Sequence, residues 1–226
     1  MTPTTAHSTP GHHALAHAGA VLARADLVTA FGHVSTLLDG GRMLITPPVP
    51  LGRVDAARCI EVPLDVDALP AGVPLEAWLH LAVYRARPDV GAVCRAQPER
   101  LTALAAAGVC VPPLTGHAVV AGAPVPISRD AVLARDPATA IRAVASLGDG
   151  HALVLRGNGA LTVGRDVGAA VARMWLLERA ARSTVIAASV GEPTALPADA
   201  VASWRQAADE LLARIWTHLD EAEAIS

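Results

Sequence analysis

The chain has 226 residues, of which 52% are hydrophobic, and a formal net charge of −3. This length and composition predict one domain with a sizeable core. They exclude a membrane span, because no apolar run reaches 18 residues, and the slightly acidic balance argues against a nucleic-acid-binding surface.

The absence of lysine and the small number of cysteines exclude some kinds of functional site. All 18 basic residues are arginines, so a Schiff-base aldolase and a phosphate-binding P-loop, which both need a lysine, are excluded. The three cysteines, Cys59, Cys94 and Cys110, are odd in number and lie in apolar contexts. They are expected to be reduced core residues, as in a cytoplasmic protein.

Residues 1–13 lack the basic and apolar regions of a signal peptide and are expected to form a frayed tail. Periodicity, turn residues and capping signals then predict, in chain order, helix 14–28, strands 33–38 and 43–46 joined by a turn at Asp39-Gly40-Gly41, strand 59–63, helix 75–86, strand 90–94, helix 99–107, an extended stretch 118–127, helix 137–147, strands 151–155 and 160–163, helix 166–188, a linker 191–197 and helix 198–222. This order predicts an α/β fold with a mixed central sheet and helices on both faces.

The predicted domain spans residues 14–190. Residues 191–226 are expected to add a linker and a helix that packs on the domain or on a neighbouring subunit. One apolar stripe runs along this last helix and consists of Trp204, Ala208, Leu211, Leu212, Ile215 and Leu219.

The stretch from Val90 to Pro98 is the centre of the candidate site. It is predicted to be a buried strand that leads into a helix. Because side chains alternate along a strand, Arg95 and Gln97 point to one face of the sheet. In α/β proteins, strand ends of this kind often carry the chemistry.

Several segments around this strand carry a family resemblance: Phe31-Gly32-His33-Val34-Ser35, Leu44-Ile45-Thr46-Pro47, Glu76-x-x-x-His80 with the run from Tyr84 to Pro98, and Ala152 to Gly159. In order and spacing they resemble the class II aldolase/adducin family, from about Ala20 to Ala188. The resemblance implies a three-layer α/β/α class II aldolase-like fold. It also implies a ring-like homotetramer whose active cleft lies between neighbouring subunits.

The resemblance implies that Glu76 is the catalytic acid/base. Enzymes of the family bind a divalent metal through histidines at the positions of Arg95, Gln97 and Asn158, and this chain replaces all three. We therefore expect no metal, no other cofactor and a small-molecule substrate. The replacements turn a metal site into a hydrogen-bonding site, or they reflect drift after loss of activity.

Arg95 has two interpretations. A buried arginine is costly unless it meets an anion, which is either an internal carboxylate such as Glu76 or a substrate. A guanidinium supplies fixed positive charge that suits a carboxylate or an enolate. Gln97 and Asn158 are expected to contact the same substrate, although Asn158 also suits a turn between two glycines.

Other candidates lie further from the strand. His33 is expected to be a second acid/base or a carboxylate contact, or else a strand residue that faces solvent. His80, one turn after Glu76, is expected to be a hydrogen-bonded core residue. Thr46 and His117 are expected to contact the substrate, and a metal site made of Glu76, His33 and His117 is a remote alternative.

The residues around this site argue against a phosphorylated substrate. Pro74-Leu75 stands where the family's phosphate users carry two serines, and Pro48-Val49 replaces a small residue and glycine. Proline lacks the N–H that a phosphate needs. The Gly32-His33-Val34-Ser35 variant is closer to family members that act on unphosphorylated carboxylates, including decarboxylases.

The sequence thus predicts a metal-independent lyase that acts on a small unphosphorylated carbonyl or carboxylate compound, by C–C cleavage, formation or decarboxylation. Cyclisation or dehydration in secondary metabolism is a further use of such a site. The alternative is a non-catalytic oligomeric scaffold or small-molecule binder, as adducin's head domain is.

Overall fold

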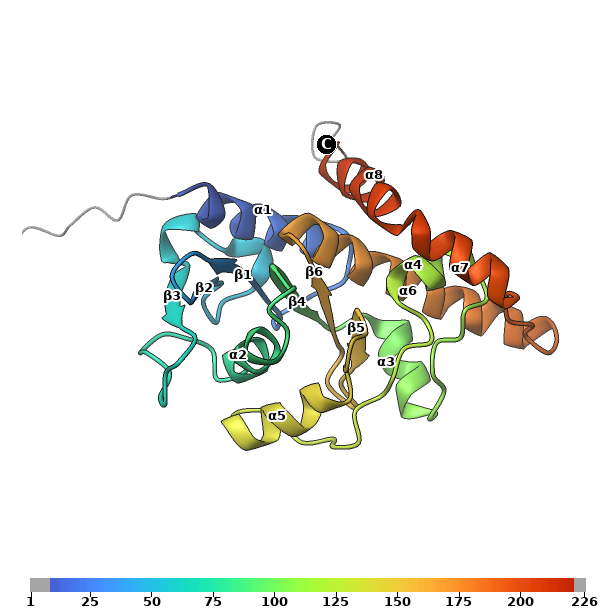
Figure 1. Cartoon of the computed structure of the whole chain (residues 1–226), viewed down its shortest axis with the longest axis horizontal. Coiled ribbons are helices and arrows are strands. Elements are labelled where there is room, and N and C mark those ends of the chain that lie inside the picture. Colours follow the sequence, from blue (N-terminus) through green and yellow to red (C-terminus); the bar gives the residue numbers. More distant parts are fainter. Residues whose placement is uncertain (1–8, 222–226) are drawn as a thin grey trace, which may run out of the picture.

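A computed structural model describes residues 9–221 (Figure 1). The strands are β1 (His33–Leu38), β2 (Arg42–Ile45), β3 (Ile60–Pro63), β4 (Ala92–Ala96), β5 (Ala152–Val154) and β6 (Ala160–Gly164). The helices are α1 (Pro10–Arg24), α2 (Ala77–Ala86), α3 (Glu99–Ala106), α4 (Gly116–Ala121), α5 (Pro137–Ala145), α6 (Val167–Val190), α7 (Ala198–Gln206) and α8 (Ala208–Glu221).

The six strands form one sheet in the order β3-β2-β1-β4-β6-β5. Each pairing between these strands is antiparallel, and the parallel character expected of a mixed sheet is confined to one isolated bridge between Ile127 and Val154. The neighbours of β4 in the sheet are β1 and β6, so this strand lies near the middle.

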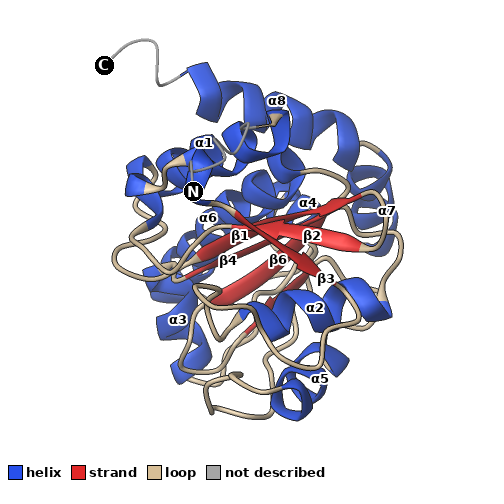
Figure 2. Ribbon diagram, turned by 90° about the vertical axis from the view of Figure 1, so that its left-hand side faces the viewer, coloured by secondary structure: helices blue, strands red, loops and turns tan. Residues whose placement is uncertain are grey.

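Helices cover both faces of the sheet, as Figure 2 shows. Cys94 and Ala96 of β4 belong to the core on the side of α1 and α6, whereas Val93 belongs to the core on the side of α2 and α5. The three-layer α/β/α prediction is therefore confirmed. The same alternation sends the side chain of Arg95 to the α2 side, opposite to Cys94 and Ala96 as predicted.

The bounds of most predicted elements agree with the structure, but the N-terminal helix begins and ends earlier than expected. Thr9 caps α1, and Pro10 occupies its first turn, so the end of the predicted tail is helical. Asp26 adopts a left-handed backbone with φ 57° just after the helix ends. The other predicted tail residues, 1–8, lie outside the described part of the chain.

The extended stretch predicted at 118–127 is wrong in its first half. The Thr115 side chain accepts a hydrogen bond from the N–H of Ala118, and Gly122 follows with φ 113°, so α4 forms between these two caps. Cys110 is also exposed, although Cys59 and Cys94 are buried as expected.

The predicted C-terminal helix is broken into α7 and α8 at Ala207. The break lets the indole of Trp204 lie against Gly116, where an added Cβ would come within 2.3 Å of the ring. Leu212 and Leu219 on α8 are buried in the core beside α6. The C-terminal segment thus packs on its own domain, and no helix among residues 9–221 is long and apolar enough to cross a membrane.

Candidate functional site

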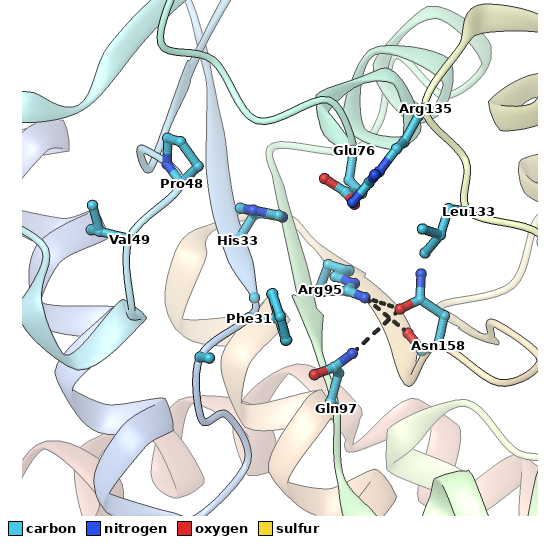
Figure 3. A pocket seen from close by; sticks show the side chains of 12 residues that line it. Phe31, His33, Pro48, Val49, Glu76, Arg95, Gln97, Leu133, Arg135 and Asn158 are labelled. Carbon is cyan, nitrogen blue, oxygen red and sulfur yellow. Dashed lines mark hydrogen bonds and ion pairs between the residues drawn. The ribbon is translucent and has the colours of Figure 1, made fainter.

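Two neighbouring strands bring the central residues of the site together. His33 on β1 and Arg95 on β4 are directly opposite in the antiparallel ladder, so their side chains share the α2 face of the sheet. They lie beside a cavity of about 330 Å³ (Figure 3). Its lining residues are Ala30, Phe31, Gly32, His33, Pro48, Val49, Glu76, Arg95, Gln97, Leu133, Arg135 and Asn158.

Arg95 is only 2% exposed, and its partners are the two oxygens of Asn158. Its guanidinium donates to the Asn158 backbone carbonyl at 3.2 Å and to the side-chain Oδ1. Gln97 Nε2 donates to the same Oδ1 at 3.3 Å. Asn158 thus orients the guanidinium without neutralising it, and no carboxylate among residues 9–221 forms an ion pair with Arg95.

Glu76 is the N-cap residue of α2, immediately before the helix rather than within its first turn. Its Oε1 accepts a hydrogen bond from Arg135 Nε at 3.1 Å, so the internal pair proposed between Glu76 and Arg95 is not formed. Burial by itself raises the pKa of Glu76, but hydrogen bonds from its own backbone N–H and from Arg135 outweigh burial and lower it. Glu76 is therefore ionised at neutral pH.

His33 is neutral at the same pH. Burial and the nearby charge of Arg95 lower its pKa to about 4, against an opposing effect of Glu76. His80 is fully buried and accordingly has a pKa well below its usual value. Its Nδ1 forms a hydrogen bond with Ser35 Oγ at 2.7 Å, which confirms the predicted structural role.

The side chains of Arg95, Gln97 and Asn158 do not fit a divalent cation. Arg95 carries a positive charge and has no lone pair to offer. The Oδ1 of Asn158 already accepts hydrogen bonds from Arg95 and Gln97. Among residues 9–221, no group of three His, Cys, Asp or Glu side chains is placed to hold a metal, so the alternative with His117 gains no support.

Two backbone positions of the cavity offer no donor to a phosphate. Pro48 has no N–H, and the N–H of Val49 is used by the carbonyl of Pro47 at 2.8 Å. The rim is apolar at Phe31 and Leu133, which are 64% and 48% exposed.

The structure does not bring two predicted residues into the cavity. Thr46 is fully buried and its hydroxyl accepts a hydrogen bond from the Val34 N–H at 3.1 Å, so it braces β1 instead. His117 is exposed on the first turn of α4 and lines a different hollow with Trp204. The structure adds Arg135 and Leu133 from the loop before α5, where no local pattern indicated a site residue.

Comparisons with known proteins agree with this architecture. Residues 13–185 match the family model "Class II Aldolase and Adducin N-terminal domain". A 3,4-dihydroxyphthalate decarboxylase from Terrabacter sp. (strain DBF63) is 33% identical over 190 residues, which cover 76% of this chain and 79% of the relative. A 3-oxo-tetronate 4-phosphate decarboxylase from Pectobacterium atrosepticum is 30% identical over 164 residues, which cover 67% of this chain and 72% of that protein.

Solved structures support the same fold. An L-fuculose 1-phosphate aldolase superposes with a TM-score of 0.81 at 20% identity, covering 90% of this chain and 98% of the aldolase. At this identity the likeness shows the fold alone. Because the family model matches most of the chain and a relative above 30% identity matches the same region, the chain belongs to the class II aldolase and adducin family.

Proposed function

We propose that the protein is a metal-independent lyase of the decarboxylase type, which acts on a small unphosphorylated carboxylate. The proposal uses no cofactor. It is supported by the decarboxylase relatives and by a buried guanidinium that Asn158 orients, while Gln97 donates to the same Asn158 oxygen. A hydroxylated aromatic or related unsaturated acid fits the apolar rim formed by Phe31 and Leu133.

The observation that carries the proposal is the electrostatics of Arg95. A guanidinium that is 2% exposed, lines a cavity and has no carboxylate partner in the described part of the chain is costly in the free protein. An anionic substrate group, or an oxyanion that develops during the reaction, relieves this cost. Such preorganised charge stabilises a transition state without rearrangement.

Glu76 moves the proton in this mechanism. Its carboxylate takes the proton of a substrate hydroxyl, and the resulting oxyanion lies against Arg95. The protonated Glu76 then returns the proton to the carbon that bears the carboxylate, while the oxyanion becomes a carbonyl. The C–C bond to the carboxylate breaks and CO₂ leaves. The electron pair of that bond re-forms the oxyanion, which solvent finally protonates.

The test is CO₂ release from a panel of hydroxylated aromatic acids and aliphatic hydroxy and keto acids, with and without a strong chelator. We expect release from at least one acid, unaffected by the chelator. Glu76→Gln, which keeps the shape but cannot accept a proton, should reduce turnover by about 10²–10⁴-fold. Arg156→Gln, at an exposed arginine outside the cavity, is the matched control and should leave turnover unchanged.

The alternative, a non-catalytic scaffold in the manner of adducin, predicts no turnover with any acid.

We further propose that the protein is a homotetramer. Phe31 and Leu133, which line the cavity, are 64% and 48% exposed, and Val132 next to Leu133 in the sequence is 62% exposed; a neighbouring subunit would cover them. Light scattering that gives the mass of a monomer at micromolar concentration would contradict the tetramer.

A further inference from the structure

A buried polar chain lies beneath the cavity, between β1 and α2. Ser35 Oγ is 2.7 Å from His80 Nδ1 and 2.8 Å from the Tyr84 hydroxyl. Ser35 and His80 are fully buried and Tyr84 is 4% exposed. Polar atoms are rarely buried without a hydrogen-bond partner. The other buried polar atoms close to these three side chains therefore also need partners.

Three nitrogens at the top of this chain lack a protein partner within residues 9–221: His33 Nδ1, His80 Nε2 and Arg95 Nε. The three side chains are 6%, 0% and 2% exposed. His33 neighbours both other side chains, because it faces Arg95 across the β1–β4 ladder and its ring lies edge to face with that of His80, with centroids 6.3 Å apart.

We propose that one ordered water is buried between His33 Nδ1, His80 Nε2 and Arg95 Nε, and that it holds His33 as the neutral tautomer with hydrogen on Nε2. Buried waters typically make about three hydrogen bonds to otherwise unsatisfied groups, which matches this set. Such a water completes the polar chain from Tyr84 to the cavity.

The tautomer of His33 follows from the direction of these hydrogen bonds. The Nε–H of Arg95 can only donate, so the water accepts from it. When Ser35 donates to His80 Nδ1, His80 Nε2 carries a hydrogen and also donates to the water. Both lone pairs of the water are then used, so it can only donate to His33 Nδ1, and the hydrogen of this imidazole lies on Nε2. In the opposite direction the water keeps one lone pair as well as one hydrogen, so both tautomers fit. We therefore assign the direction in which Ser35 donates to His80.

This tautomer changes the role of His33. Nδ1 is the nitrogen enclosed by protein, so Nε2 is the one that faces the cavity next to Arg95. A neutral imidazole N–H there donates a hydrogen bond to the substrate oxygen that becomes negative, and it does not act as a base. His80, Ser35 and Tyr84 are then positioning residues. The catalytic consequence rests on the proposed function, whereas the water and the tautomer do not.

Nitrogen NMR of histidine-labelled protein at pH 7 tests the tautomer directly, without substrate. Spectra of His33→Gln and His80→Gln assign the two rings. We expect His33 to be protonated on Nε2 and unprotonated on Nδ1. A hydrogen on Nδ1, or on both nitrogens, overturns the proposal whether or not the protein releases CO₂.

Two variants of His80 test the water. Glutamine places a polar group near the Nε2 position, so His80→Gln should preserve the single His33 tautomer. Leucine offers no such group, so His80→Leu should give a mixture of tautomers. If both variants fail to fold, a crystal structure of the wild type decides. Ordered density within hydrogen-bond distance of all three nitrogens supports the proposal, and its absence at high resolution overturns it.

Discussion

At the scale of single residues, we propose that Arg95 takes the place of a metal ion. Arg95 and Gln97 both donate hydrogen bonds to Asn158, so the three side chains form one connected group at the cavity. A guanidinium polarises an oxygen through hydrogen bonds and charge, which is a weaker effect than coordination to a divalent metal. It nevertheless supplies a fixed charge with a fork geometry that matches a carboxylate or a vicinal pair of oxygens.

Substitutions of Arg95 should separate the effect of its positive charge on turnover from the effect of its hydrogen-bonding geometry. Arg95→Gln removes both and should reduce kcat/KM by about 10²–10³-fold, the range found when one oxyanion-stabilising donor is removed. Arg95→Lys keeps the charge but loses the fork and the contact geometry with Asn158, so its loss should be smaller. Steady-state kinetics together with melting temperatures make the comparison. Equal activity in wild type and Arg95→Gln would contradict this role.

Arg135 should act through Glu76. Its hydrogen bond and charge lower the pKa of Glu76, so Arg135→Gln should shift the acid limb of the kcat/KM profile to higher pH. The exposed Arg129 of the same loop makes no ion pair within residues 9–221, and Arg129→Gln is the matched control. An unchanged acid limb in Arg135→Gln would show that this contact does not set the protonation of Glu76.

At the scale of elements, the turn between β5 and β6 positions Asn158 in the site. Gly157 and Gly159 flank it with φ of 71° and 77°. A Cβ on Gly159 would lie 2.1 Å from the Ala96 carbonyl oxygen, whereas a Cβ on Gly157 meets nothing within 4 Å. Of the two glycines, only Gly159 therefore packs tightly against β4.

These two glycines form a matched pair of alanine substitutions. Gly157→Ala should cost roughly 1 kcal/mol of stability, from the left-handed backbone alone. Gly159→Ala adds a clash with β4 and should cost about 3 kcal/mol or more, with loss of turnover as Asn158 moves away from Arg95. Chemical denaturation and CO₂ release measure both. Similar costs for the two variants would contradict the tight approach.

The comparison of sequence and structure is clearest at this scale. The alternation along β4 correctly separated Arg95 from Cys94 and Ala96, because strand periodicity is a local property. The pairing of Glu76 with Arg135 was not predictable, since it joins residues 59 apart through a loop without a pattern. The failure at His117 has a related cause, because the sequence does not indicate where the segment that carries it lies relative to the cavity.

At the scale of the whole molecule, buried neutral histidines couple stability to pH. His33 has a pKa of about 4 in the folded protein and about 6.5 when unfolded. Between these values the unfolded chain binds more protons, so stability is fully present above pH 6.5 and is lost as the pH falls towards 4. His80 and His151, whose pKa values are also lowered, act in the same direction.

The contribution of His33 to this loss should be about 3 kcal/mol, because each unit of pKa difference corresponds to about 1.4 kcal/mol. His33→Gln cannot take up the proton and should show a flatter dependence of unfolding free energy on pH between 4 and 6.5. Urea denaturation across this range provides the measurement. Parallel curves for the two proteins would mean that His33 titrates alike in both states.

The central claim is that the site works without a metal, and elemental analysis of untagged protein tests it most directly. The account predicts far less than one equivalent of any divalent metal per chain, both before and after chelation, with an unchanged melting curve. One full equivalent that is removed by the chelator together with stability or turnover would contradict the role given to Arg95.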